Sequence, residues 1–343
     1  NLSKLPVDIS EKISNLCNSL RYQLLLLGNS NYYFTALVME EGIPAKYNDI
    51  KIPEKNFIFG LLHIYLKMSP DNFLHNDLKM DNIVLTHWEY PIEYNGKFYT
   101  PVDNLIPALI DFGFANTTKH LTYNYYTAQS IYGAYTSAPP EGLILTVLQE
   151  FELLRNNMVD IVKSKTIKGD IFSIGTVFIN ISIGAYYSML LVDSQLGQQE
   201  VSKLIIKIAM AFRLDISTSE TRSNIFIYFQ LYIGWFGFNY FLNDNTYPTI
   251  DMDQAQNESY SLFMINSGIL RKIKHLIEKF SIGKKLYLKL NEIWNEDPMK
   301  FDLLRKMIAW YPEQRATLPE LMEHPYFNSI FYSRVKRRKQ MLK

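Results

Sequence analysis

Two short polar motifs carry residue types that can transfer a phosphoryl group from ATP. The first motif runs from His75 to Asn82 and reads HNDLKMDN, and the second motif is Asp111-Phe112-Gly113. The transfer needs a carboxylate for the proton of the attacking hydroxyl, a cation near the phosphoryl group, and an amide and a second carboxylate for magnesium. The motifs supply an Asp, a Lys two residues later, an Asn five residues later and a further Asp. A lone His-x-Asp is weak, but both motifs in this order strongly indicate this chemistry.

The composition allows a sizeable core and gives no global charge that would select a partner. The chain has 343 residues, of which 48% are hydrophobic, and a formal net charge of +1. This length can bury one sizeable core or two small ones. A nearly neutral chain has no overall field that attracts nucleic acid or membrane, so we do not expect nucleic acid as a partner.

The number of cysteines and the first residues of the chain indicate in which cellular compartment we expect the protein. Cys17 is the only cysteine, which excludes an internal disulfide framework and a cysteine metal cluster. Residues 1–12 have no apolar core and do not form a secretory signal. We expect an intracellular protein, in the cytoplasm or nucleus. The common Ile, Asn and Lys would also suit a large DNA virus or an AT-rich microbe, and a viral protein would lie in the virion or host cell.

Two uncharged stretches, 171–192 and 224–243, are long enough to cross a bilayer. Both contain many Asn, Ser, Gln, Gly or Tyr residues and lack flanking basic clusters. We therefore expect buried helices of a large helical domain and no membrane span.

Hydrophobic periodicity predicts a short β-containing segment ahead of a large helical domain. We expect a helix over 9–20, strands over 22–27 and 32–39, a helix over 56–68, and strands over 83–85 and 108–110. Asn95-Gly96 predicts a hairpin turn. Further helices are expected over 143–156, 170–190, 201–213, 224–242, 261–281, 301–309 and 317–324. The two polar motifs lie near the junction of these parts.

Several segments, in the same order, resemble the eukaryotic-type protein kinase family over about residues 36–330. The first motif resembles its catalytic loop, the second its magnesium loop, 139–141 the end of its activation segment, 168–175 the start of its central buried helix, and 310–317 with 324–327 its last two helices. The resemblance implies an α+β, protein-kinase-like fold, with a mostly helical C-lobe and a partial β-containing N-lobe. It also implies ATP and Mg²⁺ as cofactors and a protein as the substrate.

The resemblance implies a chemical role for four residues. Asp77 would accept or orient the proton of the substrate hydroxyl, and Lys79 would contact the nucleotide and neutralise charge on the transferring phosphoryl group. Asn82 and Asp111 would ligate magnesium, which prefers oxygen donors. A Lys two residues after the Asp is similar to Ser/Thr-specific rather than Tyr-specific members of the family.

Five other residues would shape the site. The resemblance implies that His75 packs behind the catalytic loop and that Gly113 gives the backbone freedom to turn under the phosphates. Asp170 would receive backbone N–H groups of the catalytic loop; a helix N-cap is its simpler interpretation, and both can hold. Glu141 and Arg315 are similar to the family's buried ion pair between the activation segment and the lower helices.

The strand that ends at Met39, together with the residues up to Gly42, resembles the hinge between the two lobes. Met39 would limit the pocket behind adenine, and the Glu40 carbonyl and the Gly42 N–H would meet the adenine edge. Val84 would form the apolar floor under the base. An apolar strand that ends in acidic residues is common, so this assignment rests on the resemblance.

The segments that in this family cover the nucleotide, here called the nucleotide roof, are missing from the sequence ahead of this hinge. No Gly-rich loop and no Lys in an Ala-x-Lys strand is present; only Lys4 and Lys12 lie upstream, and Glu11 fits best as an exposed helix residue. Positioning accounts for most of this catalysis. We therefore expect that a missing upstream segment or a partner chain completes the N-lobe, or that activity has been lost.

Three further departures from the family pattern bear on regulation and substrate. Asn76 replaces an Arg that usually reads a phosphate on the activation segment, which predicts control without such a phosphate. Ala134 stands where the family has a Thr, with Thr136 two positions away, which weakens the Ser/Thr assignment. The 28 residues between Asn82 and Asp111 exceed what a simple hairpin needs.

The resemblance divides the chain into a partial N-lobe over 1–39, a C-lobe over 40–330 with an enlarged helical region at about 187–300, and a basic tail over 331–343. The aromatic run 225–241 is more often core than interface; if it were exposed, it would bind a partner. We interpret the tail as solvated, with weak binding to nucleic acid or an anionic surface as the alternative.

The leading hypothesis is an ATP- and Mg²⁺-dependent protein kinase directed to Ser/Thr. A catalytically inactive kinase-like scaffold is the second hypothesis, which the missing roof motivates and the intact motifs oppose. A small-molecule phosphotransferase of related fold, such as an aminoglycoside phosphotransferase, is the third. The second motif, Lys79 and the pair Glu141 and Arg315 favour a protein substrate over this third hypothesis.

Overall fold

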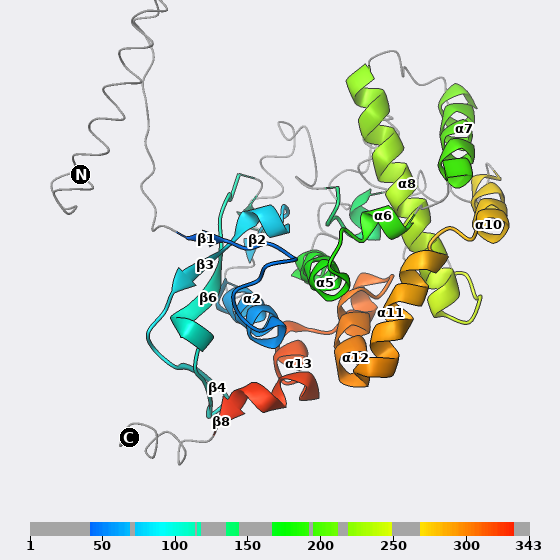
Figure 1. The fold of residues 1–343 in the computed structure, drawn as a ribbon. Coiled ribbons are helices and arrows are strands. Elements are labelled where there is room, and N and C mark those ends of the chain that lie inside the picture. Colours follow the sequence, from blue (N-terminus) through cyan, green and yellow to red (C-terminus); the bar gives the residue numbers. More distant parts are fainter. Residues whose placement is uncertain are drawn as a thin grey trace, which may run out of the picture. The chain divides into compact units, whose positions relative to one another are not determined.

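The computed structural model describes residues 42–68, 73–113, 115–117, 135–143, 167–191, 195–211, 219–248 and 268–332 (Figure 1). The chain divides into two compact units, residues 1–41 and 42–343, and all the described residues belong to the second. The elements expected over 9–20, 22–27 and 32–39 lie outside the described residues, as do nearly all of the helix expected over 143–156 and the basic stretch 335–339.

A three-stranded antiparallel sheet lies directly beside the two polar motifs. Its central strand β3 (Ile83–His87) pairs with β1 (Ile43–Pro44) on one side and with β6 (Leu105–Leu109) on the other. Ile83 faces Leu109 across the ladder, and the N–H of Ile110 donates to the carbonyl of Asn82 at 3.0 Å. Because β3 begins where the first motif ends and β6 ends just before the second, this register brings the two motifs together.

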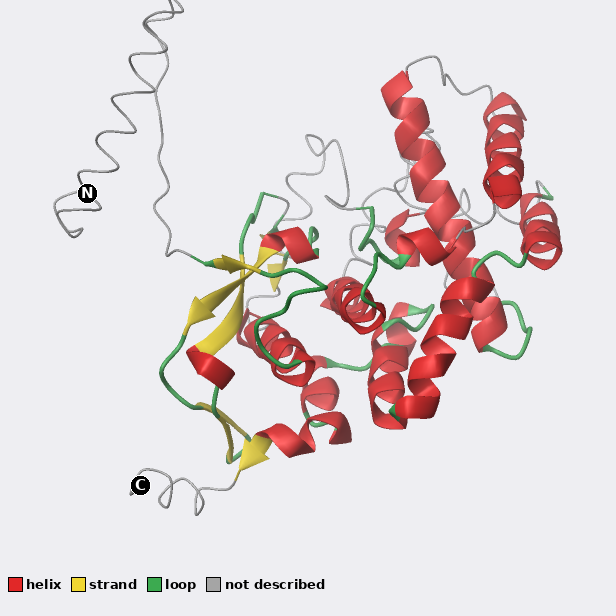
Figure 2. Ribbon diagram, viewed as in Figure 1, coloured by secondary structure: helices red, strands yellow, loops and turns green. Residues whose placement is uncertain are grey.

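A second small sheet includes part of the long segment between the two motifs, residues 83–110. Strands β4 (Ile92–Tyr94) and β5 (Lys97–Tyr99) form a hairpin, and β5 also pairs with β8 (Phe331–Tyr332) near the end of the chain (Figure 2). The turn residues Asn95 and Gly96 have φ angles of 48° and 71°, as a two-residue hairpin turn requires. The predicted hairpin turn is therefore confirmed.

Helices form most of the other described residues of this unit. They are α2 (Glu54–Met68), α5 (Ile167–Ile183), α6 (Ser188–Leu191), α7 (Gln195–Ala211), α8 (Ser219–Leu242), α10 (Ile269–Phe280), α11 (Lys284–Glu296), α12 (Pro298–Met307) and α13 (Leu318–Met322). The 3₁₀ helices are Met80–Asn82, Val102–Asn104, Pro312–Gln314 and Pro325–Ile330, and a short ladder joins β2 (Phe73–Leu74) to β7 (Asn116–Thr117). The strong helix content and small antiparallel sheets agree with the predicted α+β class.

Two of the helix predictions need correction. The single helix expected over 170–190 is two helices, because the chain turns at Gly184, whose φ is 64°, between α5 and α6. Helix α11 was not predicted at all. The other helices that lie among the described residues are confirmed, with ends that shift by a few residues.

The core is built around α5 and α8. Every residue from 169 to 180 in α5 is buried, and α5 contacts α2, α11 and α12. In α8 the aromatic run is core rather than surface; its buried aromatic residues are Tyr228, Phe229, Tyr232, Trp235, Phe236 and Phe238. Within the described ranges, none of the helices has the length and apolar character needed to cross a bilayer.

Glycines allow the turn between α10 and α11 to approach α8 closely. A Cβ atom on Gly237 of α8 would lie 2.2 Å from the carbonyl oxygen of Ile282. A Cβ on Gly283 would lie 2.2 Å from the backbone nitrogen of Phe238, and Gly283 also has a φ of 83°. Glycine at both positions is therefore required for this packing.

Candidate active site

The backbone of the first motif is held by the carboxylate of Asp170. Asp170 is only 2% exposed and accepts hydrogen bonds from the N–H groups of His75, at 2.7 Å, and Asn76, at 3.1 Å. Hydrogen bonds to a charged acceptor are about twice as strong as neutral ones. Asp170 lies inside the first turn of α5 rather than at an N-cap position, so the N-cap interpretation is wrong and the loop-binding contact is what the structure shows.

Both motifs contain a residue with left-handed backbone. Asn76 has a φ of 59° and Asp111 a φ of 60°. This region is unfavourable for most L-residues, but Asn and Asp tolerate it best after glycine. The left-handed backbone at position 76 therefore gives a structural reason for Asn at this position. The sequence alone indicated only that the Arg usual in the family, which reads a phosphate on the activation segment, is absent. Non-glycine residues in this region often cluster at functional sites.

The carboxylate of Asp77 is buried; one of its oxygens accepts a hydrogen bond, and the other is buried without a donor among the described residues. Its exposed fraction is 3%, its Oδ2 accepts a hydrogen bond from Asn82 Nδ2 at 2.9 Å, and Lys79 Nζ lies 3.5 Å from the same oxygen. Its Oδ1 accepts no hydrogen bond from any residue in the described part of the chain. A buried acceptor without a donor is uncommon and calls for a functional explanation.

The side-chain amide of Asn82 has a fixed orientation. Its Nδ2 donates to both the carboxylate and the backbone carbonyl of Asp77, at 2.9 and 2.8 Å. Because both partners are acceptors, the NH₂ group must face Asp77, which leaves the amide oxygen of Asn82 as the atom available to a metal.

The His75 side chain, in the first motif, contacts residues in and next to the second motif. It is fully buried, its Nε2 lies 3.2 Å from the carbonyl oxygen of Ile110, and its ring centroid lies 5.2 Å from that of Phe112. The packing role expected for His75 matches these contacts. In the second motif the N–H of Gly113 donates to Asp111 Oδ1 at 3.3 Å, and the Asp111 side chain is exposed.

The oxygen atoms of Asn82 and Asp111 fit magnesium that is held together with phosphates. Among the residues that the structure describes, no group of three or more His, Cys, Asp or Glu side chains could hold a metal ion. Magnesium is usually bound by one or two carboxylates plus substrate phosphates and water, so a full protein cage is not needed. The amide oxygen of Asn82 and the exposed Asp111 carboxylate supply such a partial donor set.

Of the four residues expected to contact the nucleotide base, two are described. The pairing of β1 with β3 brings Gly42 against Val84: a Cβ atom on Gly42 would lie 2.6 Å from Val84 Cγ2. Met39 and Glu40 lie outside the described residues. The sheet therefore places the expected floor residue beside the last residue of the expected hinge.

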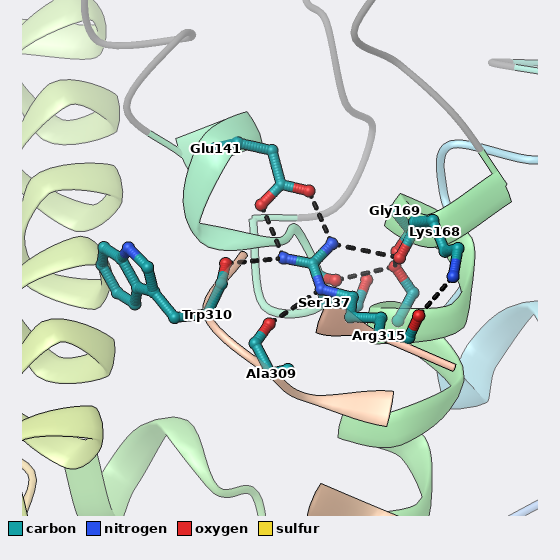
Figure 3. A network of polar contacts seen from close by, with 8 residues as sticks. Ser137, Glu141, Lys168, Gly169, Ala309, Trp310 and Arg315 are labelled. Atoms are coloured by element: carbon teal, nitrogen blue, oxygen red, sulfur yellow. Dashed lines mark hydrogen bonds and ion pairs between the residues drawn. The ribbon is translucent and has the colours of Figure 1, made fainter. Parts of the chain in front are cut away.

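The Arg315 guanidinium is the centre of a buried network (Figure 3). It donates two hydrogen bonds to the carboxylate of Glu141, at 2.6 and 2.7 Å. It donates three more to backbone carbonyls, those of Ala309 (2.8 Å), Lys168 (3.1 Å) and Trp310 (3.1 Å). All five of its N–H donors are therefore used. The expected ion pair is present.

Two residues that sequence reasoning missed hold the segment ahead of Glu141. Ser173 Oγ in α5 donates to the carbonyl of Ser137 at 2.8 Å, and the buried Tyr187 hydroxyl donates to the carbonyl of Thr136. Ser173 offered a signal, since it is a polar residue in a wholly buried helix. Ala134 lies outside the described residues.

Comparison with known proteins agrees with this geometry. Residues 32–327 match the family model described as the protein kinase domain, and this range contains both motifs, Asp170 and the pair Glu141 and Arg315. A search of curated proteins finds no match. Because the family model covers most of the chain, the chain belongs to the protein kinase domain family.

Proposed function

We propose that this kinase domain transfers the γ-phosphoryl group of ATP to a Ser or Thr hydroxyl of a protein. The observation that carries the proposal is the buried Asp77 carboxylate, whose Oδ2 is engaged by Asn82 and Lys79 while Oδ1 has no donor among the described residues. An oriented carboxylate with one oxygen that has no donor in the described part of the chain is suited to accept the proton in such a transfer.

Four residues of the two motifs then have one chemical task each. Asp77 Oδ1 accepts the proton of the substrate hydroxyl. At the same time the hydroxyl oxygen forms the new bond to the γ-phosphorus, and the bond between that phosphorus and the ADP oxygen breaks. Lys79, whose side chain is one-third exposed, offsets the negative charge of the phosphoryl oxygens. Asn82 and Asp111 bind Mg²⁺ through oxygen atoms. The bound ion supplies charge neutralisation at the phosphates.

The expected substrate class follows from two further features. Lys79 occupies a position that is similar to Ser/Thr-directed members of the family. Ser173, Tyr187 and Arg315 fix residues 136–141, the end of the segment that in this family lies beside the protein substrate. Gly42 and Val84 line the base, and an upstream segment or a partner chain completes the nucleotide roof.

The test uses the full-length chain with whatever precedes residue 1 in its reading frame. Transfer of labelled phosphate from Mg-ATP is measured on matched peptide pools that contain Ser, Thr or Tyr as the only hydroxyl residue. We expect transfer to the Ser and Thr pools. Asp77→Asn should lower kcat by about 10²–10⁴-fold with little change in the KM for ATP.

The matched control is Asp103→Asn, which makes the same substitution at an exposed position of the 3₁₀ helix Val102–Asn104. It should leave the rate unchanged. Equal incorporation by the wild-type chain and Asp77→Asn would contradict the role of Asp77. Absence of both transfer and any thermal stabilisation by Mg-ATP would instead identify a kinase-like scaffold.

A further inference from the structure

Helices α7 and α10 of the enlarged helical region pack side by side and against α8 (Figure 1). Five of the eleven exposed side chains described on these two helices are Lys or Arg. The exposed Lys and Arg residues of the two helices, together here the basic face, are Lys203, Lys207, Arg271, Lys272 and Lys279. None of them belongs to the candidate active site or to the network around Arg315.

Helix α7 has one buried stripe and one exposed stripe. Val201, Leu204, Ile205 and Ile208 are at most 5% exposed and face the core. The exposed residues of the opposite stripe follow the same i, i+3, i+4, i+7 spacing; they are Lys203, Ile206, Lys207 and Met210. Ile206 is 40% and Met210 72% exposed, so two apolar side chains alternate with two lysines on one line.

Helices α7 and α10 contact each other, and charges from both act on Glu200 of α7. Glu200, near the start of α7, forms an ion pair of 2.6 Å with Lys203. The hydrogen bond from Lys203 lowers the pKa of Glu200, and the charges of Lys279, at the end of α10, and of Lys207 lower it further. Lys279 therefore lies near the beginning of α7.

The acidic groups on these helices are few. Glu200 and Glu278 are the acids of α7 and α10, and Glu278 accepts a hydrogen bond from the Tyr247 hydroxyl at 3.0 Å. From residue 269 to residue 289 the chain has seven Lys and Arg side chains and one Glu, whereas its total net charge is +1. Positive charge is thus concentrated on α10 and α11, while on α7 the exposed Ile206 and Met210 alternate with Lys203 and Lys207.

We propose that the basic face binds peripherally to the surface of an anionic phospholipid membrane. Lysines near such a surface gain electrostatic energy from lipid phosphates and carboxylates, and apolar side chains on the same stripe enter the headgroup region. A nucleic acid would use the lysines and leave Ile206 and Met210 without a role. Adsorption at the surface requires no membrane-spanning helix.

The test measures co-sedimentation of the full-length chain with vesicles of phosphatidylcholine alone and of phosphatidylcholine with roughly one-third phosphatidylserine. We expect binding only to the anionic vesicles, and weaker binding as salt rises, because salt screens exposed charges. Reversing two charges with Lys207→Glu and Lys272→Glu should lower the partition coefficient by at least about tenfold. Ile206→Ser with Met210→Ser should lower it several-fold at unchanged charge.

A charge-matched control reverses two exposed lysines elsewhere, Lys51→Glu with Lys97→Glu. This control should bind anionic vesicles nearly as well as the wild-type chain, and far-UV circular dichroism checks that every variant is folded. Equal binding to neutral and anionic vesicles would overturn the proposal, as would equal loss in the control. Binding to a labelled oligonucleotide but not to vesicles, abolished by Lys207→Glu with Lys272→Glu, would also overturn it and identify a nucleic-acid surface.

Discussion

Arg315 and Glu141, 174 positions apart in the chain, are joined by two nearly parallel hydrogen bonds of 2.6 and 2.7 Å. The Arg315 side chain is fully buried, whereas that of Glu141 is one-quarter exposed. The guanidinium also lies over the ring of Phe172, with its central carbon 4.9 Å from the ring centroid. Arg315 thus ties the segment that ends at Glu141 to α5 and to the loop after α12.

We expect Arg315→Lys to destabilise the fold by about 3–5 kcal/mol, because one ammonium cannot replace a five-donor fork and would leave buried acceptors unpaired. Urea unfolding followed by circular dichroism measures this loss. Arg305→Lys makes the same change at an exposed position and should be nearly neutral. A loss at position 315 no larger than at position 305 would mean that the network is not structural.

Asp170→Asn should reduce phosphoryl transfer more than it reduces stability. The amide has one acceptor oxygen, so either the His75 or the Asn76 N–H loses its partner, at a cost of about 1–3 kcal/mol. The loosened loop then holds Asp77 less well. Kinetics and urea unfolding are measured on the same preparation, with the exposed Asp49→Asn as control. An unchanged kcat would contradict a positioning role for Asp170.

Gly42→Ala should weaken ATP binding through Val84. The added Cβ would overlap Val84 Cγ2, so Val84 must move away from the place that we propose for it under the base. We expect a KM for ATP that rises severalfold, and partial recovery in the double variant Gly42→Ala with Val84→Ala, because the smaller side chain makes room for the new methyl group. Kinetics of both single variants and the double variant give the coupling. Strictly additive effects would show that the two residues do not meet.

Stability should depend on pH through the capping box of α13. The backbone N–H of Thr317, and then its hydroxyl, donate to the Glu320 carboxylate and lower its pKa from the usual 4.5. A carboxyl group with a depressed folded pKa stabilises the fold above its unfolded pKa, and this contribution disappears as pH falls below about 4.5. Thermal unfolding of the wild-type chain and Glu320→Gln should therefore differ at pH 7 and converge at pH 3. A gap that persists at pH 3 would point to another cause.

Magnesium alone should not stabilise the domain, because the proposed ligands Asn82 and Asp111 would supply only part of its coordination. Mg-ATP at about 100 times its Kd should stabilise the native state by about 2.7 kcal/mol. Differential scanning fluorimetry with Mg²⁺, ATP with chelator, and Mg-ATP separates these contributions. Asp111→Asn should remove most of the magnesium-dependent part. A shift with Mg²⁺ alone would reveal a metal site elsewhere.

The helical architecture could be predicted largely from hydrophobic periodicity, and its misses have physical causes. In α11 the leucines at 286, 288 and 290 alternate as in a strand, while Leu286, Leu290 and Ile293 repeat as in a helix. Packing against α8 and α12 decides in favour of the helix and leaves Leu288 half exposed. The division between α5 and α6 had a visible signal in Gly184, which continuous apolar residues obscured.

Some features of the candidate site could also be predicted from the sequence, and others could not. The two motifs are local in sequence, so their residue types and spacing were readable. Contacts such as Ser173 with Ser137 and Tyr187 with Thr136 end on backbone carbonyls, which any residue type supplies, so no pattern predicts them. The contact of Gly42 with Val84 depends on the register of β1 against β3, and two-residue strands give no periodic signal.

The pairing of β5 with β8 has a consequence for the order of events during synthesis. Phe98 pairs with Tyr332, and Thr100 shares a hydrogen bond of 2.7 Å with the same tyrosine, 232 positions later. A two-stranded hairpin alone is marginally stable, and so distant a partner is slow to find. Until Phe331 and Tyr332 have been synthesised, the hairpin between Asn82 and Asp111 therefore lacks its third strand. The segment between Asn82 and Asp111 becomes fully ordered only after β8 has emerged from the exit tunnel.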